Sequence, residues 1–240
     1  MHAFIGEFFG CLTLIVFGDG VVANVVLKKT KGNNSGWIVI ATGWGLAVML
    51  GVFMANATGS PDADINPAVT LAKWALGMHQ DVMTVFGYII AQIAGCFAGG
   101  VLVWLAYLPH FRETPETGTK LAVFCTDPGI STPFGNILCE VIGTVMLLLG
   151  LGAIVSAGQF SVGLLPFLVG MLVWAIGLSL GGPTGYAINP ARDFGPRLAH
   201  ALLPIHGKGD SAWHYAWVPV IGPVIGAVIG AVLWNVLILS

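Results

Sequence analysis

The stretch TGYAINPARD, residues Thr184–Asp193, decides the fold because it joins a helix-capping asparagine and a proline to an arginine after an apolar run. The tripeptide Asn-Pro-Ala inside it also occurs at residues 66–68, again after an apolar run. Asparagine is a strong helix N-cap and proline is favoured at the first helical position, so each tripeptide predicts the start of a helix. The residues that follow, AVTLAKWALG and ARDFGPRLAHALL, are too short to cross a bilayer, which takes about 20 residues. Two half-helices are therefore predicted.

The composition places the chain in a membrane. Of its 240 residues 56% are hydrophobic and 8% charged, with a mean hydropathy of +0.88, whereas soluble domains carry about 25% charged residues. Six apolar runs are long enough to span a bilayer: Phe4–Leu27, Trp37–Ala57, Val82–Leu108, Phe134–Val155, Ser161–Leu180 and Trp213–Leu239. The first run lacks the basic start and the cleavage site of a removable signal peptide.

Several function classes are excluded by what the sequence lacks. The formal net charge is −2, and no basic patch with interleaved aromatic residues indicates a nucleic-acid partner. The four cysteines show neither a disulfide framework nor metal-ligand spacing. We therefore expect no metal site and no cofactor.

The two halves of the chain repeat each other. Glu7 and Gly10 in the first span match Glu140 and Gly143 in the fourth, just as the two tripeptides match each other. Three crossings per half is an odd number, so the second half enters the membrane from the opposite side. We predict one all-α membrane domain over residues 1–240, with six transmembrane helices and two re-entrant half-helices in an inverted three-plus-three repeat. The halves are residues 1–108 and 133–240, and residues 109–132 form a surface connection.

The two elbows, each an Asn-Pro-Ala tripeptide with the non-helical residues before it, can form a pore that selects neutral solutes. Half-helices from opposite faces would meet near the midplane, where each contributes about half a positive charge of macrodipole and repels cations. Non-helical backbone at this depth, Ser60–Ile65 and Pro183–Ile188, is tolerated only inside protein or along a water-filled cavity. Its carbonyls would line that cavity as acceptors, and the capping asparagines would offer their NH2 groups as donors. The pore residues expected at the elbows are Asn66, Pro67, Ala68, Asn189, Pro190 and Ala191.

Arg192 breaks the symmetry of the repeat. It stands three residues after Asn189, whereas Val69 holds the equivalent place after Asn66. A charged residue inside a membrane protein is costly and should face a cavity, so Arg192 is expected to donate hydrogen bonds there and to add to the barrier against cations.

Four acidic residues near the elbows have two interpretations each. Glu7 and Glu140 lie inside spans, and they either hold the elbow loops by accepting backbone N–H bonds or form a proton relay. Asp62 and Asp64 either make one mouth of the pore acidic or bond to local backbone, as turn residues do. The histidines after the first span are expected at the membrane interfaces: His79, His110, His200, His206 and His214.

The paired tripeptides, the second extended as GYAINPARDFGP, together with the glutamates of spans one and four, resemble the major intrinsic protein family of aquaporins and glycerol facilitators. The resemblance covers nearly the whole chain, and Asp193 after Arg192 is similar to the glycerol-conducting branch, the aquaglyceroporins. It implies a homotetramer with one pore per subunit and cytoplasmic termini in the membrane of a bacterial cell.

The resemblance also implies a selectivity constriction at four positions. By the family's pattern these are Trp44, Gly177, Tyr186 and Arg192. Strict spacing back from the first elbow would give Leu46, but the string Trp-Gly-Leu favours Trp44. Gly177 implies a wide opening, and Tyr186 stands where phenylalanine is common, so its hydroxyl either narrows the ring or adds a polar contact. An apolar wall opposite a donor suits glycerol.

Two function classes remain open. The first is a passive channel for glycerol, water and related neutral solutes such as urea, dihydroxyacetone and undissociated lactic acid. The alternative is a secondary transporter of a small hydroxylated solute or weak acid, because broken helices in inverted repeats also mark that class. An intramembrane enzyme lacks a plausible nucleophile and base near the elbows.

The distribution of basic residues between the two sides of the membrane is the opposite of the one expected for the orientation that the resemblance implies. On that layout only Lys73 lies inside, the reverse of the usual excess of cytoplasmic Lys and Arg. The residues on the outer side are Lys28, Lys29, Lys31, Arg112, Lys120, Arg192, Arg197 and Lys208. A passive pore conducts in either direction, so the predicted function does not depend on the orientation.

Overall fold

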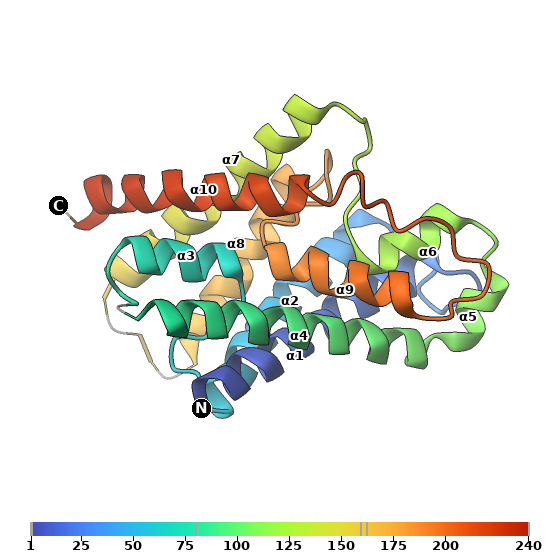
Figure 1. Cartoon of the computed structure of the whole chain (residues 1–240), viewed down its shortest axis with the longest axis horizontal. Coiled ribbons are helices and arrows are strands. Elements are labelled where there is room, and N and C mark those ends of the chain that lie inside the picture. The colour runs from blue at the N-terminus through green and yellow to red at the C-terminus, as the bar shows by residue number, and fades with distance from the viewer. Residues whose placement is uncertain (1, 80, 159, 162, 240) are drawn as a thin grey trace.

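The computed structural model describes residues 2–79, 81–158, 160–161 and 163–239, and these residues form a helical bundle (Figure 1). The first half holds α1 (His2–Val26), α2 (Trp37–Ala57), α3 (Pro67–Ala75) and α4 (Val82–Ala106). The connection holds α5 (Leu108–Glu113) and α6 (Thr117–Phe124). The second half holds α7 (Pro133–Ser156), α8 (Leu164–Leu180), α9 (Pro190–Leu202), α10 (Val218–Trp234) and a terminal π-helix, η1 (Asn235–Leu239).

The predicted all-α membrane fold is confirmed, with the largest differences at the starts of the last two spans. Five of the described helices are long and apolar enough to cross a membrane, and α8 is a shorter apolar helix of 17 residues. That length lies at the lower limit of about 17 residues for a membrane span. The last helix begins at Val218 rather than Trp213.

The connection between the halves contains two short helices that pack on the bundle. It forms α5 and α6, and Phe111 and Phe124 from these helices are buried. Their rings lie 5.7 Å apart between centroids. These buried rings fix the connection to the bundle.

The helices pack in equivalent pairs that interlock the halves. In the first half α1 packs against α2 and α4, and in the second α7 packs against α8 and α10. Each half-helix also packs across the molecule, α9 against α4 and α3 against α10. In Figure 1, α3 and α9 lie end to end in the middle of the bundle, while α1 begins and η1 ends at the same side.

Small residues make the tightest crossings possible. A Cβ on Gly95 of α4 would lie 2.2 Å from the Phe8 carbonyl oxygen of α1, and a Cβ on Gly226 of α10 would lie 2.8 Å from the Val141 carbonyl oxygen of α7. The same contact thus recurs in both halves. Because lipid supplies no hydrophobic drive between helices, close backbone approach is a main source of their association.

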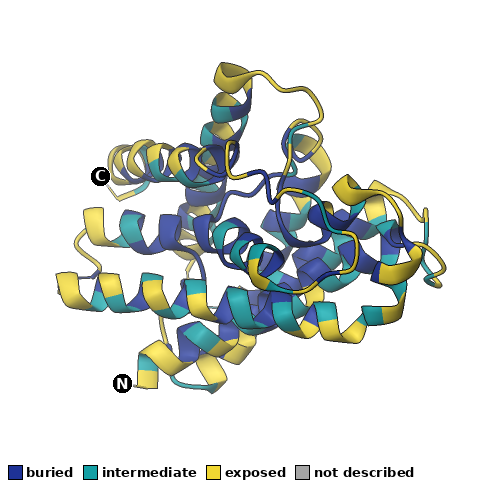
Figure 2. Cartoon of the chain, turned by 45° about the vertical axis from the view of Figure 1, so that its right-hand side comes forward, coloured by how far each residue is buried: buried dark blue, intermediate teal, exposed yellow. Residues whose placement is uncertain are grey.

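The outer surface of the bundle is apolar. Buried residues follow the inner faces of the helices and the elbows, and exposed residues follow the outer faces (Figure 2). On α4 the exposed residues Met83, Phe86 and Ile90 have the spacing of one helix face. Such a face is suited to contact with lipid chains.

Replacing Gly95 with alanine should weaken the fold. The added methyl group overlaps the α1 backbone, and overpacking of this kind costs about 1–3 kcal/mol. Gly20 lies in α1, and a Cβ added there would meet nothing within 4 Å, so Gly20→Ala is the matched control. Thermal unfolding of the purified proteins in detergent should show a lower midpoint for Gly95→Ala alone; equal midpoints would contradict the crossing.

Candidate functional site

The two half-helices begin at the predicted asparagines. The Asn66 side chain caps α3 by accepting a hydrogen bond from the Ala68 N–H at 2.8 Å. The Asn189 side chain caps α9 by accepting from the N–H groups of Ala191 and Arg192 at 3.1 and 3.2 Å. Both amide oxygens are thus used by their own helix, as the sequence predicts.

The amide nitrogens join one elbow to the other. Asn66 Nδ2 donates to the carbonyl oxygen of Ile188 at 2.9 Å, and Asn189 Nδ2 donates to that of Ile65 at 2.8 Å. The sequence predicts these NH2 groups as donors toward a pore. Each group carries two N–H donors, so one is used for the other elbow and one remains.

The elbows hold their backbone in a conformation that these residue types rarely adopt. Ala63 and Ile65 have φ angles of 42° and 44°, and Tyr186 and Ile188 have φ angles of 39° and 43°. Ala63 corresponds to Tyr186, and Ile65 to Ile188, at the same spacing that separates Asn66 from Asn189. Positive φ is costly for side chains of this size, above all for a β-branched one. The elbows therefore need external bonds to stabilise them.

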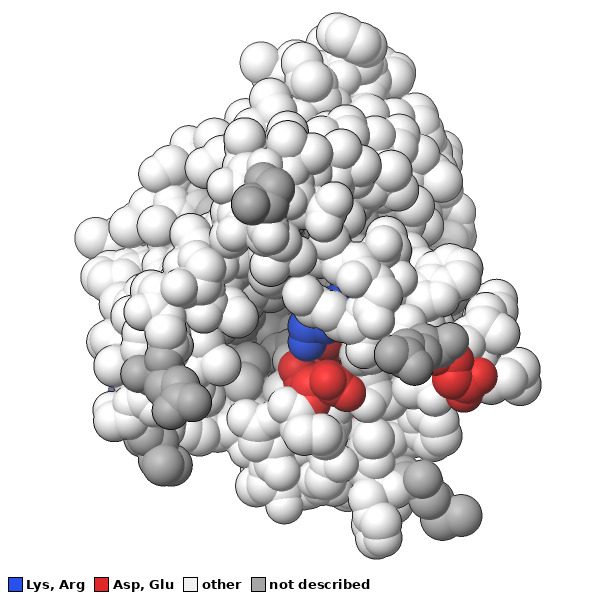
Figure 3. All heavy atoms as spheres, turned by 90° about the vertical axis from the view of Figure 1, so that its left-hand side faces the viewer, with Lys and Arg blue, Asp and Glu red and all other residues white. Residues whose placement is uncertain are grey.

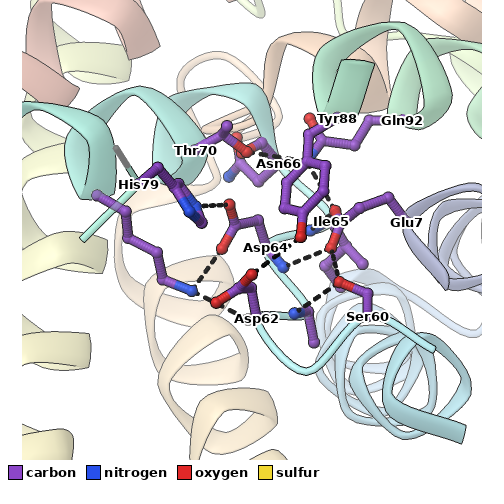
Figure 4. A network of polar contacts seen from close by, with 12 residues as sticks. Glu7, Ser60, Asp62, Asp64, Ile65, Asn66, Thr70, His79, Tyr88 and Gln92 are labelled. Carbon is purple, nitrogen blue, oxygen red and sulfur yellow. Dashed lines mark hydrogen bonds and ion pairs between the residues drawn. The ribbon is translucent and has the colours of Figure 1, made fainter. Parts of the chain in front are cut away.

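Glu7 provides such bonds to the first elbow. It is fully buried in α1. Oε1 accepts from the Ser60 hydroxyl at 2.6 Å and the Asp64 N–H at 3.0 Å, and Oε2 accepts from the Ile65 N–H and Gln92 Nε2, both at 2.7 Å (Figure 4). Every one of these bonds ends on the carboxylate as acceptor.

Glu140 bonds the second elbow in the same way from α7. Its Oε1 accepts from the Thr184 hydroxyl at 2.7 Å and the Ala187 N–H at 3.0 Å, and Oε2 accepts from the Ile188 N–H at 2.8 Å. Glu140 is fully buried too. The shared pattern supports the loop-holding interpretation of both glutamates, since each carboxylate stabilises backbone that the helices leave unpaired.

Both elbows line one cavity of about 360 Å³. Figure 3 shows the face on which it opens, with basic and acidic atoms gathered in the hollow. One wall is apolar and comes from α1, α2, α7 and α8. Its residues include Leu14, Trp44, Val48, Val52, Leu147, Leu151, Val169 and Val173. The polar part of the lining comes from the elbows and half-helices. Its residues include Asp62, Asp64, Asn66, Lys73, Asn189 and Arg192.

Three of the four predicted constriction residues line this cavity: Trp44, Tyr186 and Arg192. The Arg192 guanidinium carbon lies 4.0 Å from the centroid of the Trp44 ring. A guanidinium at this distance over an aromatic face is attracted by the ring quadrupole. The arginine is therefore held against one wall.

Gly177 contributes differently from the expectation. A Cβ there would lie 2.7 Å from both Cζ and the hydroxyl oxygen of Tyr186. The space that glycine leaves is filled by the tyrosine ring, so Gly177 acts on the opening through the position of Tyr186 and not by lining the cavity itself. The Tyr186 hydroxyl is buried in this slot and has no hydrogen-bond partner among the described residues.

Trp37 packs against Tyr186 and Gly177, a role that was not predicted from the sequence. Its Nε1 donates to the Gly177 carbonyl oxygen at 3.0 Å, and its ring meets that of Tyr186 edge to face with centroids 5.9 Å apart. Its position seven residues before Trp44 on the same helix face was the available signal.

Asp19 was also missed. It is fully buried in α1, and Oδ1 lies 3.9 Å from Nη1 of Arg192. An ionisable residue inside a span is a functional candidate by default, and that rule would have found it.

Asp193 lies behind the cavity rather than in its wall. It is fully buried, and its carboxylate accepts from Arg197 Nε at 2.8 Å and from the Thr126 N–H and hydroxyl at 2.8 and 2.7 Å. These bonds tie α9 to the segment that follows α6. Asp193 thus positions the half-helix that carries Arg192.

The mouth beside α3 carries an acidic cluster with one paired lysine (Figure 4). Asp64 is buried, pairs with Lys73 and lies 2.8 Å from Nε2 of His79. Asp62 accepts from the Tyr88 hydroxyl at 2.9 Å, and its carbonyl oxygen accepts from Lys73 Nζ at 2.9 Å. The two carboxylates thus bond to side chains of other segments rather than to local backbone, and Lys73 balances the charge of Asp64.

Two of the histidines expected at the membrane interfaces are buried instead. His79 reaches Asp64, and this hydrogen bond raises the pKa of the imidazole. His200 is fully buried in α9, with Nδ1 2.9 Å from the Ser211 hydroxyl. Among the described residues, no group of three or more His, Cys, Asp or Glu side chains is placed to hold a metal ion.

Comparison with known proteins assigns the family. A family model described as major intrinsic protein matches residues 1–234. The chain belongs to the major intrinsic protein family. It is 58% identical over 222 residues to a probable glycerol uptake facilitator protein of Thermotoga maritima, an alignment that covers 92% of this chain and 93% of the relative. It is 53% identical over 233 residues to glycerol uptake facilitator protein 3 of Lactiplantibacillus plantarum, covering 97% and 95%.

A solved structure of the same family agrees in fold. The X-ray structure of the aquaglyceroporin from Plasmodium falciparum superimposes with a TM-score of 0.86 at 29% sequence identity. The match covers 99% of this chain and 96% of that one. The chain is thus a multi-pass membrane protein.

In this member of the major intrinsic protein family, Glu140→Gln should loosen the second elbow. The glutamine nitrogen would face an N–H donor, and leaving a buried donor unpaired costs about 1–3 kcal/mol. We expect a lower unfolding midpoint and a loss of both water and glycerol flux in proteoliposomes. Glu116→Gln, whose side chain is 51% exposed, is the control. Unchanged flux and midpoint would rule out the holding role.

Proposed function

We propose that the chain is a passive channel that lets glycerol and related small neutral solutes, with water, diffuse across a membrane while it excludes ions and protons. Two of its relatives are named as glycerol uptake facilitators. One observation carries the proposal: the N-termini of α3 and α9 are joined end to end in the wall of a cavity whose other wall is apolar. The chain is a channel and not an enzyme.

Exclusion of cations follows from the charge at the elbows. Two helix N-termini bring about half a positive charge each to the same point, and the Arg192 guanidinium, which faces Asp19 at 3.9 Å, lines the same cavity. The acids that line the cavity among the described residues, Asp62 and Asp64, belong to the mouth cluster with Lys73. A cation or proton therefore meets a positive barrier along the pore.

Passage of a polyol follows from the two walls. The elbows offer amide donors and carbonyl acceptors, and the Arg192 guanidinium offers further donors. Trp44 and the valines of α2 and α8 face them with carbon. A solute with hydroxyls on one side and carbon on the other can exchange its water for these groups. An ion receives too little to replace its hydration shell.

A secondary transporter is the alternative, and the polar wall argues against it. Coupled transport needs a site for the driving ion, which in such proteins is formed by acids or free carbonyls near the midplane. Here the meeting point of the half-helices is occupied by amides, and two of its carbonyls already accept bonds from them.

The further solutes, the assembly and the membrane location are inferred from the family pattern. We infer that water, urea, dihydroxyacetone and undissociated lactic acid also pass, because all are small and uncharged. We infer a homotetramer surrounded by lipid in a bacterial cell membrane, with cytoplasmic termini and one pore per subunit. The apolar outer faces of the helices are compatible with both lipid and subunit contacts.

Flux measurements test the channel against the transporter. Stopped-flow light scattering on proteoliposomes should give glycerol uptake that rises linearly with concentration and is the same with and without a proton or sodium gradient. Saturation together with gradient dependence would favour the transporter. The absence of glycerol flux in vesicles that still conduct water would reject glycerol as the solute.

Gly177→Ala should narrow the constriction. The new methyl group takes the place of the Tyr186 ring end, and Trp37 and Gly181 block the other sides, so the ring must move into the cavity. We expect the glycerol-to-water permeability ratio to fall roughly tenfold, the lower range for one methylene in a tight pocket. Tyr186→Phe in the same chain should restore part of the ratio.

Gly182→Ala is the control for this substitution, because a Cβ added there would meet nothing within 4 Å. An unchanged ratio in Gly177→Ala, or an equal change in Gly182→Ala, would remove Tyr186 from the constriction.

A further inference from the structure

The two arginines of α9 differ in how they are bonded. Arg197 is fully buried, and its guanidinium donates to both carboxylate oxygens of Asp193 at 2.8 and 3.1 Å. It also donates to the carbonyl oxygens of Ser211, Ala212 and Thr126. Nη1 of Arg192, by contrast, is buried without a hydrogen-bond partner among the described residues. All three guanidinium nitrogens of Arg197 thus donate to protein oxygens, whereas Nη1 of Arg192 is left without an acceptor among the described residues.

The charge of Arg192 faces one acid. Asp19 is the carboxylate within ion-pair distance of it among the described residues, with Oδ1 3.9 Å from Nη1. Asp193 is the nearest acid in sequence, but it is paired with Arg197. Both oxygens of Asp19 are buried and accept no hydrogen bond from a described residue. A buried carboxylate without other partners is costly unless an opposite charge compensates it.

Gly18, next to Asp19 in α1, makes room for the tryptophan on which Arg192 lies. A Cβ on Gly18 would lie 2.3 to 2.6 Å from three carbons of the Trp44 ring, so glycine at this position admits the indole. Arg192 lies on that indole at 4.0 Å. Gly18 and Asp19 thus serve the tryptophan and the arginine of one constriction, the first by its small size and the second by its charge.

We propose that Asp19 is a positioning residue that determines the selectivity of the channel through Arg192. Its carboxylate balances the guanidinium charge and holds the group against Trp44 without taking up its donors. The constriction then offers hydrogen bonds to a hydroxylated solute and attracts anions less than a lone arginine would. This inference rests on the proposed function in that it places Arg192 at the constriction.

The test compares Asp19→Asn, Arg192→Val and the double variant in proteoliposomes and planar bilayers. Valine is the residue that the first half carries at the equivalent place, Val69. Asp19→Asn keeps the shape and removes the charge, so the guanidinium moves toward water. We expect the glycerol-to-water permeability ratio to fall roughly threefold or more, the lower range of coupling between contacting residues, and an anion current carried by formate to appear.

The double variant separates positioning from a general structural role. If Asp19 acts through Arg192, adding Asp19→Asn to Arg192→Val should leave the permeability ratio where Arg192→Val put it. It should also raise the unfolding midpoint above that of Arg192→Val, because no unpaired charge stays buried. This second readout holds even if Asp19→Asn alone fails to fold. Asp81→Asn is the control, since asparagine also caps a helix and Asp81 caps α4 on the exposed surface.

Three results would overturn the proposal. The first is a glycerol-to-water permeability ratio and an anion current in Asp19→Asn that equal those of the unaltered chain. The second is a change in the permeability ratio when Asp19→Asn is added to Arg192→Val. The third is a double variant whose unfolding midpoint is no higher than that of Arg192→Val. If Arg192→Val alone leaves the ratio unchanged, the place of the arginine at the constriction fails, whereas the stability comparison still reports whether the two charges pair. Loss of glycerol flux from every chain, the unaltered one included, would instead reject glycerol as the solute.

Discussion

The reciprocal bond between the elbows is the constraint on which the rest of the structure depends. Each capping asparagine uses its oxygen for its own half-helix and its nitrogen for a carbonyl of the other elbow. This requires two backbone segments in a conformation that isoleucine rarely adopts, and the buried carboxylates of Glu7 and Glu140 stabilise them. The glycine crossings place α4 and α10 beside these carboxylates: Gln92 of α4 donates to Glu7, and a Cβ on Gly222 of α10 would lie 2.6 Å from the Cβ of Glu140.

The features that could be predicted from the sequence are those set by a short local motif or by the internal repeat. The half-helices begin where asparagine and proline predict, and the all-α membrane fold follows from apolar runs and a duplicated pattern. The packing of Tyr186 in the slot of Gly177 could not be predicted, because it depends on two segments whose distance only the fold sets. The same holds for the cluster around Asp64, where His79 comes from beyond the half-helix. Asp19 was visible in the sequence, but its partner was not.

The basic residues on the side opposite Lys73 are largely engaged in holding the fold. Lys120 is buried and donates to the carbonyl oxygens of His206 and Gly207, and Lys208 donates to three carbonyls at the end of α9. Arg197 is bonded on all sides. These cations complete helix ends and loops that leave carbonyls unpaired. Their excess therefore reflects the needs of folded backbone as well as any rule of membrane insertion.

The crosswise packing of α9 on α4 and of α3 on α10 has a consequence for the origin of such chains. A single half would leave its capping amide and its elbow carbonyl without partners, and its re-entrant segment would lack the helix on which it rests. A half-length ancestor could bury these groups only by associating with a second copy inserted upside down. Fusion of two such copies would free each half to diverge, so that an arginine can stand at 192 where the other half has a valine at 69.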